Sequence, residues 1–248
     1  RRFLARAALS RQSPAMTPLD PRTVLGAYAV GVFPMADARD AGEVYWVEPR
    51  RRAILPLDGF HLSRSLRRTI AADRFRVTAD HAFGQVLALC AEAAADRPDT
   101  WINGQIEQVF GRLHAMGHAH SVECWDGDRL VGGLYGLALG RAFFGESMVS
   151  RASDASKVAL AWLVARLKVG GFGLLDCQFQ TAHLQSMGAV EIDRADYMAL
   201  LEAALSGGVG ASAGGAAGRF AALDERGADS EVVSGPVSGQ DIVQLLVQ

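Results

Sequence analysis

The sequence has few cysteines, no long hydrophobic run and no excess of one charge. Its 248 residues contain only three cysteines, Cys90, Cys124 and Cys177, which are widely separated. An odd number of scattered cysteines gives neither a disulfide framework nor a zinc knuckle and favours a reducing compartment. No run approaches the roughly eighteen apolar residues of a membrane-spanning helix. The formal net charge of −2 gives the whole molecule no attraction for a polyanion.

Several catalytic and cofactor-binding motifs are also absent. The stretch GESMVSRASDASKVAL, from Gly145 to Leu160, comes close to two serine-nucleophile motifs and completes neither. G-x-S-x-G would require glycine at Val149, and S-x-x-K would require lysine at Ser156. No phosphate-binding loop or dinucleotide fingerprint occurs, so we expect no cofactor.

The histidines do not form a recognisable metal motif. His114 and His118 have i, i+4 spacing, but Gly117 interrupts the helix between them, and no H-E-x-x-H occurs. We therefore expect no metal at these residues or at His120. His183, on a short predicted helix, is expected to be a packed or capping residue.

Composition divides the chain into five segments. Residues 1–15 contain four arginines and no acid, and this extension of uncertain status is left out of the fold prediction. Aromatic residues and prolines between 16 and 55 predict a small N-terminal subdomain. Residues 56–206 form the predicted catalytic domain, and the Gly/Ala-rich stretch 207–219 is typical of a flexible linker. Residues 220–248 return to an apolar pattern and are expected to pack on the body.

Periodicity within 56–206 predicts a mixed α/β (α+β) fold. Three segments with period two, separated by turns at Asp126–Gly127 and at Gly140, predict an antiparallel meander. The segment that opens on Asp80 is expected to be a helix with that residue as N-cap. A capped amphipathic helix and a buried strand follow the meander. The helical patterns are at 61–72, 80–94, 103–117, 153–171, 181–188 and 194–205, and the buried strand is at 172–179.

Two short stretches carry unusual residues for a buried strand. In LLDCQF, alternation places Asp176 and Gln178 on one face and Cys177 on the other. A buried carboxylate needs a partner or a purpose, so Asp176 is either a salt-bridging group at the strand end or part of a site. Cys177 is expected to fill the core. The pair Gly132–Gly133 indicates a bulge or the close approach of a ligand.

Arginines are concentrated between Arg50 and Arg76, where eight of them face two acids. Arg64, Arg67 and Arg68 share one helical face, which is either a solvated surface or a patch that follows phosphates. The large aromatic residues are either core or stacking surfaces for unpaired bases.

Nine stretches in order resemble one family, the leucyl/phenylalanyl-tRNA–protein transferases, and cover nearly everything from about 17 to 200. They are AYAVGVFPMAD, WVEPRRRAILPL, HLSRSLRR, VTADHAFGQV, TWI, RLHAMGHAHSVECW, LVGGLYG, FFGESMVSRASDASKVAL and DCQFQTAHLQSMGA. The resemblance implies a GNAT-like acyltransferase domain with a small N-terminal subdomain, in a bacterial cytoplasmic enzyme without cofactor. The family moves leucine, and also phenylalanine or methionine, from aminoacyl-tRNA to proteins that begin with Arg or Lys. This transfer marks those proteins as N-degron substrates.

The resemblance also implies roles for particular residues. Asp176 and Gln178 match the family's proposed catalytic pair, and Glu146 matches an acidic residue of its pocket. Trp46 and Trp101 match aromatics near the terminal adenosine and the aminoacyl group. The chain departs from some members at two substrate-binding positions, with Phe110 for tyrosine and Thr181 for an asparagine that orients the glutamine.

The expected chemistry is aminolysis of an ester that is already activated, which explains the incomplete serine motifs. Gln178 would accept the amine's hydrogens, and Asp176 would stabilise the charge that develops on nitrogen. Glu146 and Ser147 would lie at the acceptor side, with Phe143 and Met148 in an apolar aminoacyl pocket. Arg64, Arg67 and Arg68 would bind tRNA.

Three other functions remain open at this point, and one of them, a plain degradation adaptor, would need only the peptide site. A CoA-dependent N-acetyltransferase would require a glycine-rich loop before the helix near 154, where SRASDAS has no glycine. A non-catalytic tRNA-binding module would explain the arginines and tryptophans but would leave Asp176, Gln178 and Glu146 without a role.

Overall fold

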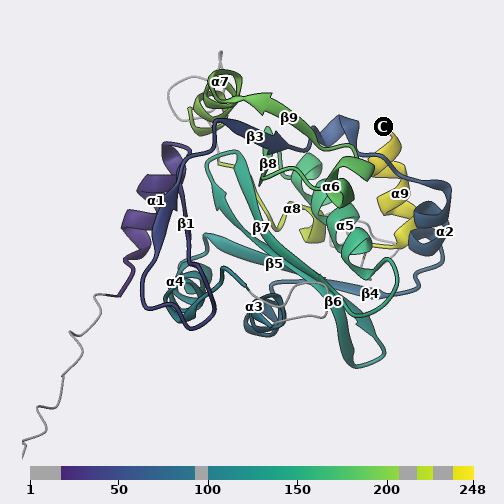
Figure 1. The fold of residues 1–248 in the computed structure, drawn as a ribbon. Coiled ribbons are helices and arrows are strands. Elements are labelled where there is room, and N and C mark those ends of the chain that lie inside the picture. Colours follow the sequence, from purple (N-terminus) through teal and green to yellow (C-terminus); the bar gives the residue numbers. More distant parts are fainter. Residues whose placement is uncertain (1–17, 93–99, 207–216, 226–236) are drawn as a thin grey trace, which may run out of the picture.

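The computed structural model describes residues 18–92, 100–206, 217–225 and 237–248. A seven-stranded mixed sheet lies between two groups of helices (Figure 1). The mixed α/β class predicted from the sequence is therefore confirmed. The extension at 1–15 and most of the expected linker at 207–219 lie outside the described residues. Within the described part of the chain, no helix has the length and apolar character needed to cross a membrane.

Between residues 61 and 205 the helices and strands expected from the sequence pattern are present in the expected order, and β9 is an additional strand. The helices are α1 (Pro21–Ala29), the short 3₁₀ helix η1 (Leu57–Gly59), α2 (Arg64–Ala71), α3 (Phe83–Ala91), α4 (Gly104–Ala115), α5 (Ala155–Val169), α6 (Ala182–Ser186), α7 (Arg194–Leu205), α8 (Ala222–Glu225) and α9 (Gly239–Val247). The strands are β1 (Phe33–Met35), β2 (Tyr45–Val47), β3 (Arg51–Ile54), β4 (Arg76–Ala79), β5 (Ala119–Asp126), β6 (Arg129–Leu139), β7 (Ala142–Ser150), β8 (Leu174–Gln178) and β9 (Val190–Asp193).

The main sheet has the order β4-β5-β6-β7-β8-β3-β9, and only β7 and β8 run parallel. Strands β5, β6 and β7 form the predicted meander. Gly127 and Gly140 occupy its turns with φ of 62° and 58°, a conformation that glycine adopts without steric cost. The parallel pair is joined through α5, as a crossover between parallel strands requires.

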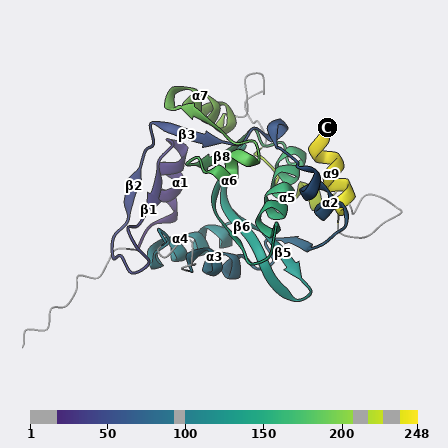
Figure 2. The same ribbon diagram turned by 45° about the vertical axis from the view of Figure 1, so that its right-hand side comes forward.

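Helix α5 is buried on almost every side. Twelve of its fifteen residues are buried, because the sheet covers one face and α2, α8 and α9 cover the other (Figure 2). The amphipathic pattern expected here from the sequence is therefore replaced by a helix that is apolar all round. Its N-cap residue, Asp154, makes no side-chain capping bond and instead pairs with Lys157 at 3.0 Å.

The opposite face of the sheet is covered by α1, α3, α4 and α7. The first of these belongs to the N-terminal segment, in which β1 and β2 form a separate two-stranded sheet. Strand β3 lies between β8 and β9 in the main sheet. The last part of the expected 16–55 subdomain is thus built into the sheet of the larger unit.

Helix α3 begins two residues later than the sequence pattern predicts, with Ala82 in place of Asp80 as its N-cap residue. Asp80 does not cap it, because this residue has a positive φ of 58° and its carboxylate accepts a hydrogen bond from the Ser121 amide at 2.9 Å. The buried Glu123 accepts instead from the amide of Ala82, the N-cap residue, at 3.3 Å. A contact with a neighbouring strand therefore determines where the helix starts.

The glycine pair in β6 has a packing explanation. A Cβ atom added at Gly132 would lie 2.5 Å from the Cβ of Ala155, the first residue of α5. At Gly133 it would lie 2.7 Å from the carbonyl oxygen of Val122 on β5. Close approach of α5 and of the neighbouring strand therefore accounts for both glycines without a ligand.

We expect Gly132→Ala to lower the free energy of unfolding by about 1–3 kcal/mol, because it would overpack the contact between β6 and α5. Urea unfolding measures this change. The control is Gly111→Ala on α4, where an added Cβ meets no atom within 4 Å. That change should stabilise the protein by about 0.5–1 kcal/mol. Equal effects of the two substitutions would contradict the packing explanation.

Candidate active site

A cavity of about 290 Å³ lies where the parallel strands β7 and β8 separate. The two strands pair only from Ala142 to Phe144 and from Leu174 to Asp176. Beyond these residues β7 continues to Ser150, whereas the chain after Gln178 turns into α6. The residues that line the cavity are Phe33, Met35, Trp101, Leu134, Tyr135, Gly145, Glu146, Ser147, Met148, Leu160, Leu163, Leu175, Cys177, Gln178, Phe179, Thr181, His183 and Leu184.

Most of this lining is apolar, and the polar groups gather at one end. Glu146 is 8 % exposed, and its Oε1 accepts hydrogen bonds from the Tyr28 hydroxyl at 2.8 Å and from Gln178 Nε2 at 3.0 Å. Since Nε2 of the glutamine is used in this way, its Oε1 is the atom left for a ligand. The orientation of Gln178, for which Thr181 was one candidate, is thus provided by Glu146.

A β-bulge directs Glu146 toward the cavity. Tyr135 pairs with Ser147 and Gly136 pairs with Gly145, so Glu146 is an extra residue on β7 without a partner on β6. Bulges often re-aim a side chain beside a functional site. Burial raises the pKa of Glu146 to about 8, and the hydrogen bonds from Tyr28 and Gln178 oppose this effect without removing it.

Asp176 lies behind Gln178 and outside the cavity lining. Its side chain is fully buried and binds Arg52 through the Nε–Oδ1 contact at 2.9 Å and the Nη2–Oδ2 contact at 2.7 Å. The Tyr197 hydroxyl donates to Oδ2 at 2.7 Å, and the Gln178 amide donates to Oδ1 at 2.8 Å. Direct stabilisation of charge on an attacking nitrogen, expected from the sequence, requires a contact that this position does not give.

The other residues expected from the sequence fall into two groups. Trp101, Ser147, Met148 and Thr181 line the cavity together with Glu146 and Gln178. The Thr181 hydroxyl caps α6 by accepting from the Leu184 amide at 3.1 Å, so it is already used.

Phe110 and Phe143, both expected to bind substrate, are fully buried and do not line the cavity. Phe110 packs against the outer side of Tyr135, a lining residue, with the ring centroids 5.4 Å apart. Phe143 points to the α5 side of the sheet and packs against Phe172 and Phe220. Phe143 therefore packs in the core outside the cavity lining, and Phe110 reaches the cavity wall only through Tyr135.

Trp46 also lies outside the lining and is 40 % exposed. It pairs with Pro34, whereas the lining residues Phe33 and Met35 pair with Val47 and Tyr45. Paired residues share a face of a sheet, so Trp46 projects from the face of the hairpin opposite to the cavity. Arg64, Arg67 and Arg68 are exposed on α2, away from the lining.

Sequence reasoning missed several residues of the site. Tyr28, Arg52 and Tyr197 come from α1, β3 and α7, and no local pattern connects them with Glu146 or Asp176. Cys177, expected in the core, lines the cavity, and burial raises the pKa of its thiol well above the usual value. His183 also lines the cavity, where burial and then the nearby Lys157 lower its pKa.

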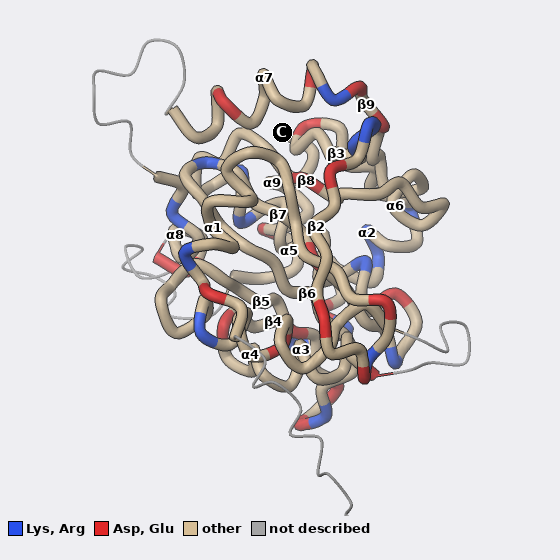
Figure 3. Tube along the Cα trace, turned by 60° about the vertical axis from the view of Figure 1, so that its left-hand side comes forward, with Lys and Arg blue, Asp and Glu red and all other residues tan. Residues whose placement is uncertain are grey.

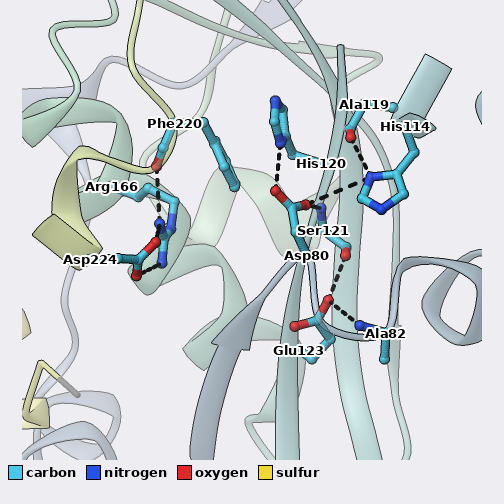
Figure 4. Close-up of polar contacts among 10 residues, drawn as sticks. All are labelled: Asp80, Ala82, His114, Ala119, His120, Ser121, Glu123, Arg166, Phe220 and Asp224. Atoms are coloured by element: carbon cyan, nitrogen blue, oxygen red, sulfur yellow. Dashed lines mark hydrogen bonds and ion pairs between the residues drawn. The ribbon is translucent and has the colours of Figure 1, made fainter. Parts of the chain in front are cut away.

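Two of the other histidines, His114 and His120, form structural contacts (Figure 4). His120 Nδ1 lies 2.7 Å from Asp80, and its ring stacks on Phe220. His114 Nδ1 lies 2.8 Å from the carbonyl oxygen of Ala119, and its ring stacks on Phe83. Across the described ranges, no group of three His, Cys, Asp or Glu side chains is arranged to hold a metal ion.

Two family models match this chain. The family model described as leucyl/phenylalanyl-tRNA protein transferase matches residues 54–202, and that of the family's N-terminal domain matches residues 17–50. A solved structure of L-PGS from Bacillus licheniformis has a TM-score of 0.37 and 10% identity, covering 62% of this chain and 51% of its own. At that distance the likeness supports no argument.

Two curated relatives share the family name. A leucyl/phenylalanyl-tRNA–protein transferase of Rhizorhabdus wittichii is 61% identical over 94% of this chain and 99% of its own length. One of Zymomonas mobilis is 64% identical over 76% of this chain and 70% of its own. The chain therefore belongs to the leucyl/phenylalanyl-tRNA–protein transferases, a family of aminoacyltransferases.

Proposed function

We propose that this enzyme transfers leucine, and also phenylalanine or methionine, from aminoacyl-tRNA to the α-amino group of proteins that begin with Arg or Lys. The observation that carries the proposal is an apolar cavity whose polar end holds Glu146 and Gln178 side by side. The new N-terminal residue would mark the acceptor protein as an N-degron substrate.

The apolar part of the cavity suits an unbranched, γ-branched or aromatic side chain without charge. Leu134, Leu160, Leu163 and Leu175 provide fixed walls, and Met148 provides an adaptable one. Methionine has three rotatable bonds and fits partners of different shape, so this wall would accept leucine, methionine and phenylalanine. A charged side chain would lose its hydration here without gaining a partner.

The reaction requires placement more than activation. The amine nitrogen attacks the ester carbonyl carbon, the bond from that carbon to the ribose oxygen breaks, and the proton lost by nitrogen ends on the ribose hydroxyl. Roughly a tenth of an α-amino group with a pKa near 8 is neutral at pH 7. Gln178 Oε1 would hold one hydrogen of this amine and direct its lone pair toward the ester. Alignment of this kind supplies a large part of the rate acceleration.

Glu146 would recognise the cationic side chain of the acceptor. Its Oε1 is occupied by Tyr28 and Gln178, whereas its Oε2 makes no hydrogen bond within the described residues. A guanidinium or ammonium group at Oε2 would satisfy this oxygen and favour the ionised carboxylate. Neutral acceptor side chains would leave a buried carboxyl without compensation, which gives the selectivity.

Exposed arginines on α2 would contact tRNA. Arg64, Arg67 and Arg68 are exposed on this helix, along which Figure 3 colours basic positions blue, and they take part in no ion pair among the described residues. Arg51, by comparison, is neutralised by Glu191 and Asp193. Unpaired arginines attract phosphates more strongly than paired ones do. The exposed Trp46 would offer a stacking surface for an unpaired base such as the terminal adenosine.

The diverging parallel strands β7 and β8, with a substrate cavity between them, support a GNAT-like acyltransferase arrangement. The CoA-dependent alternative is less well supported, because a pyrophosphate at the start of α5 would meet the carboxylate of Asp154 and no glycine loop. A non-catalytic tRNA-binding module would need neither the apolar cavity nor the pair at its polar end.

Radiolabelled leucine should pass from charged tRNA to a peptide that begins with arginine, and not to one that begins with alanine. An Nα-acetylated arginine peptide should also receive none, since its amine is blocked. Gln178→Ala should lower kcat about 10- to 100-fold because it removes an alignment contact. Transfer of acetyl from acetyl-CoA in place of leucine would contradict the proposal.

Binding of an arginine peptide should tighten as the pH rises from 6 to 8 and then level off. The carboxyl of Glu146, with a pKa of about 8, must lose its proton to pair with the guanidinium, which itself stays charged. The dissociation constant should therefore fall by up to about tenfold per pH unit below 8. Titration calorimetry measures this.

The controls separate Glu146 from the amine of the peptide. A norleucine peptide carries the same α-amino group without the cation, and Glu146→Gln cannot ionise. With the norleucine peptide, or with Glu146→Gln, the dissociation constant should change little between pH 6 and 8. A profile that persists in Glu146→Gln would show that another group titrates.

Replacing Arg64 and Arg68 by glutamine should weaken tRNA binding and flatten its dependence on salt. The slope of log K against log salt should fall by roughly 0.7–0.9 for each phosphate that is no longer neutralised. Filter binding at several salt concentrations measures this slope. Arg51→Gln is the control, since that arginine is already paired. An equal effect of the control would contradict a specific role for α2.

A further inference from the structure

A buried arginine lies directly behind the polar end of the cavity. Arg52 is 1 % exposed, and its guanidinium lies between the rings of Phe33 and Tyr197, 4.7 and 4.6 Å from their centroids. Its Nη1 donates to the carbonyl oxygen of Gly31 at 3.0 Å, and Nε and Nη2 bind Asp176. Both faces and three nitrogens of the group are therefore fixed.

Burying this ion pair needs an explanation beyond stability. Removing two charges from water costs about as much as their attraction returns, so a buried pair contributes little to the net stability of a fold. An apolar side chain at this position would avoid the cost of burying a charge, yet the chain keeps Arg52. A positioning role explains the ion pair better than stability does. The other contacts of Asp176 indicate which residue is positioned.

Asp176 holds Gln178 in an unusual backbone conformation. Gln178 has a positive φ of 56°, a backbone conformation that is sterically unfavourable for residues other than glycine. The hydrogen bond from the Gln178 amide to Asp176 Oδ1, at 2.8 Å, stabilises this conformation. The Tyr197 hydroxyl donates to Oδ2 of the Asp176 carboxylate, and Arg52 donates to both of its oxygens. These bonds fix the carboxylate. The direction of the glutamine side chain thus depends on groups from β3 and α7.

We propose that Arg52 and Tyr197 are positioning residues, which act through Asp176 on the backbone of Gln178. Asp176 serves here as the fixed acceptor that turns the chain at the end of β8. This inference rests on the proposed role of Gln178 as the residue that aligns the amine. A displacement of that amide oxygen by about 1 Å is enough to reduce the rate of an alignment-dependent reaction about 100-fold.

Tyr197→Phe is the conservative test, because it keeps the ring beneath Arg52 and removes only the hydroxyl bond to Asp176. Removal of this single hydrogen bond should lower kcat about 3- to 10-fold. Arg52→Lys keeps the charge but cannot make the two-pronged contact, and kcat should fall about 10- to 100-fold. In both variants the KM for charged tRNA should change less than twofold, since the tRNA contacts lie elsewhere.

The chain offers a matched control in a second buried arginine. Arg166 is 3 % exposed, binds Asp224 through Nη1 and Nη2 at 2.6 and 2.7 Å, and stacks on Phe220 at 5.0 Å (Figure 4). It belongs to α5, its partner Asp224 belongs to α8, and it does not line the cavity. Arg166→Lys should lower the melting temperature to a similar extent as Arg52→Lys and leave kcat within twofold of the wild type.

A spectroscopic signal distinguishes positioning from general loosening. The backbone amide of Gln178 donates to a carboxylate, so its proton resonance in a ¹H–¹⁵N spectrum should shift when Asp176 moves. We expect this shift in Arg52→Lys and Tyr197→Phe, and not in Arg166→Lys. If kcat falls no more in Arg52→Lys and Tyr197→Phe than in Arg166→Lys, the positioning role is overturned. If Gln178→Ala transfers leucine at the wild-type rate, the proposed function of Gln178 fails instead.

Discussion

The site depends on the early separation of two parallel strands. Strands β7 and β8 share only three paired positions before they diverge, and the cavity occupies the space that further pairing would have filled. A sheet that stays paired along its length leaves no room for a ligand between neighbouring strands, which lie only about 4.8 Å apart. Helix α5 joins these strands, and its residues Leu160 and Leu163 line the cavity.

Two carboxylates near this opening differ in what surrounds them. Glu146 has neutral donors only, a tyrosine hydroxyl and an amide, so burial dominates and its pKa rises to about 8. Asp176, opposite Phe144 on the neighbouring strand, faces a guanidinium together with a tyrosine hydroxyl and a backbone amide. In the proposed function the first carboxylate exchanges a proton for an arriving cation, whereas the second is already paired with Arg52. Similar side chains have different uses because their partners differ.

Much of the fold could be predicted from local patterns. The meander, its two glycine turns and the order of helices and strands follow from hydrophobic periodicity and turn residues. The start of α3 could not be predicted, because it depends on Glu123, about forty residues away on another strand. The covered outer face of α5 could not be predicted either, since it depends on helices near the end of the chain.

Residues of the site could be predicted only where a single short stretch of the sequence contains unusual residues. Asp176, Gln178 and Glu146 stand out because polar residues interrupt apolar strands, and the family resemblance gave them roles. Arg52 is one of three consecutive arginines, and alternation separates its direction from that of Arg51 without telling which is covered. The position of α7 decides this, and with it the identity of Tyr197 as a partner. The spacing of residues along the sequence does not predict contacts between segments that are far apart in it.

The C-terminal helix is attached to the helix that carries the exposed arginines. The amide of Gly239, at the start of α9, donates to Asp73 at 2.7 Å, and Asp73 lies just beyond the end of α2. Ile242 and Leu246 of α9 are buried, and α9 contacts α2. Local unfolding of α9 must break these contacts, so α9 helps to hold the arginine-bearing helix in place. The surface that α2 presents therefore depends on a segment that is far from it in sequence.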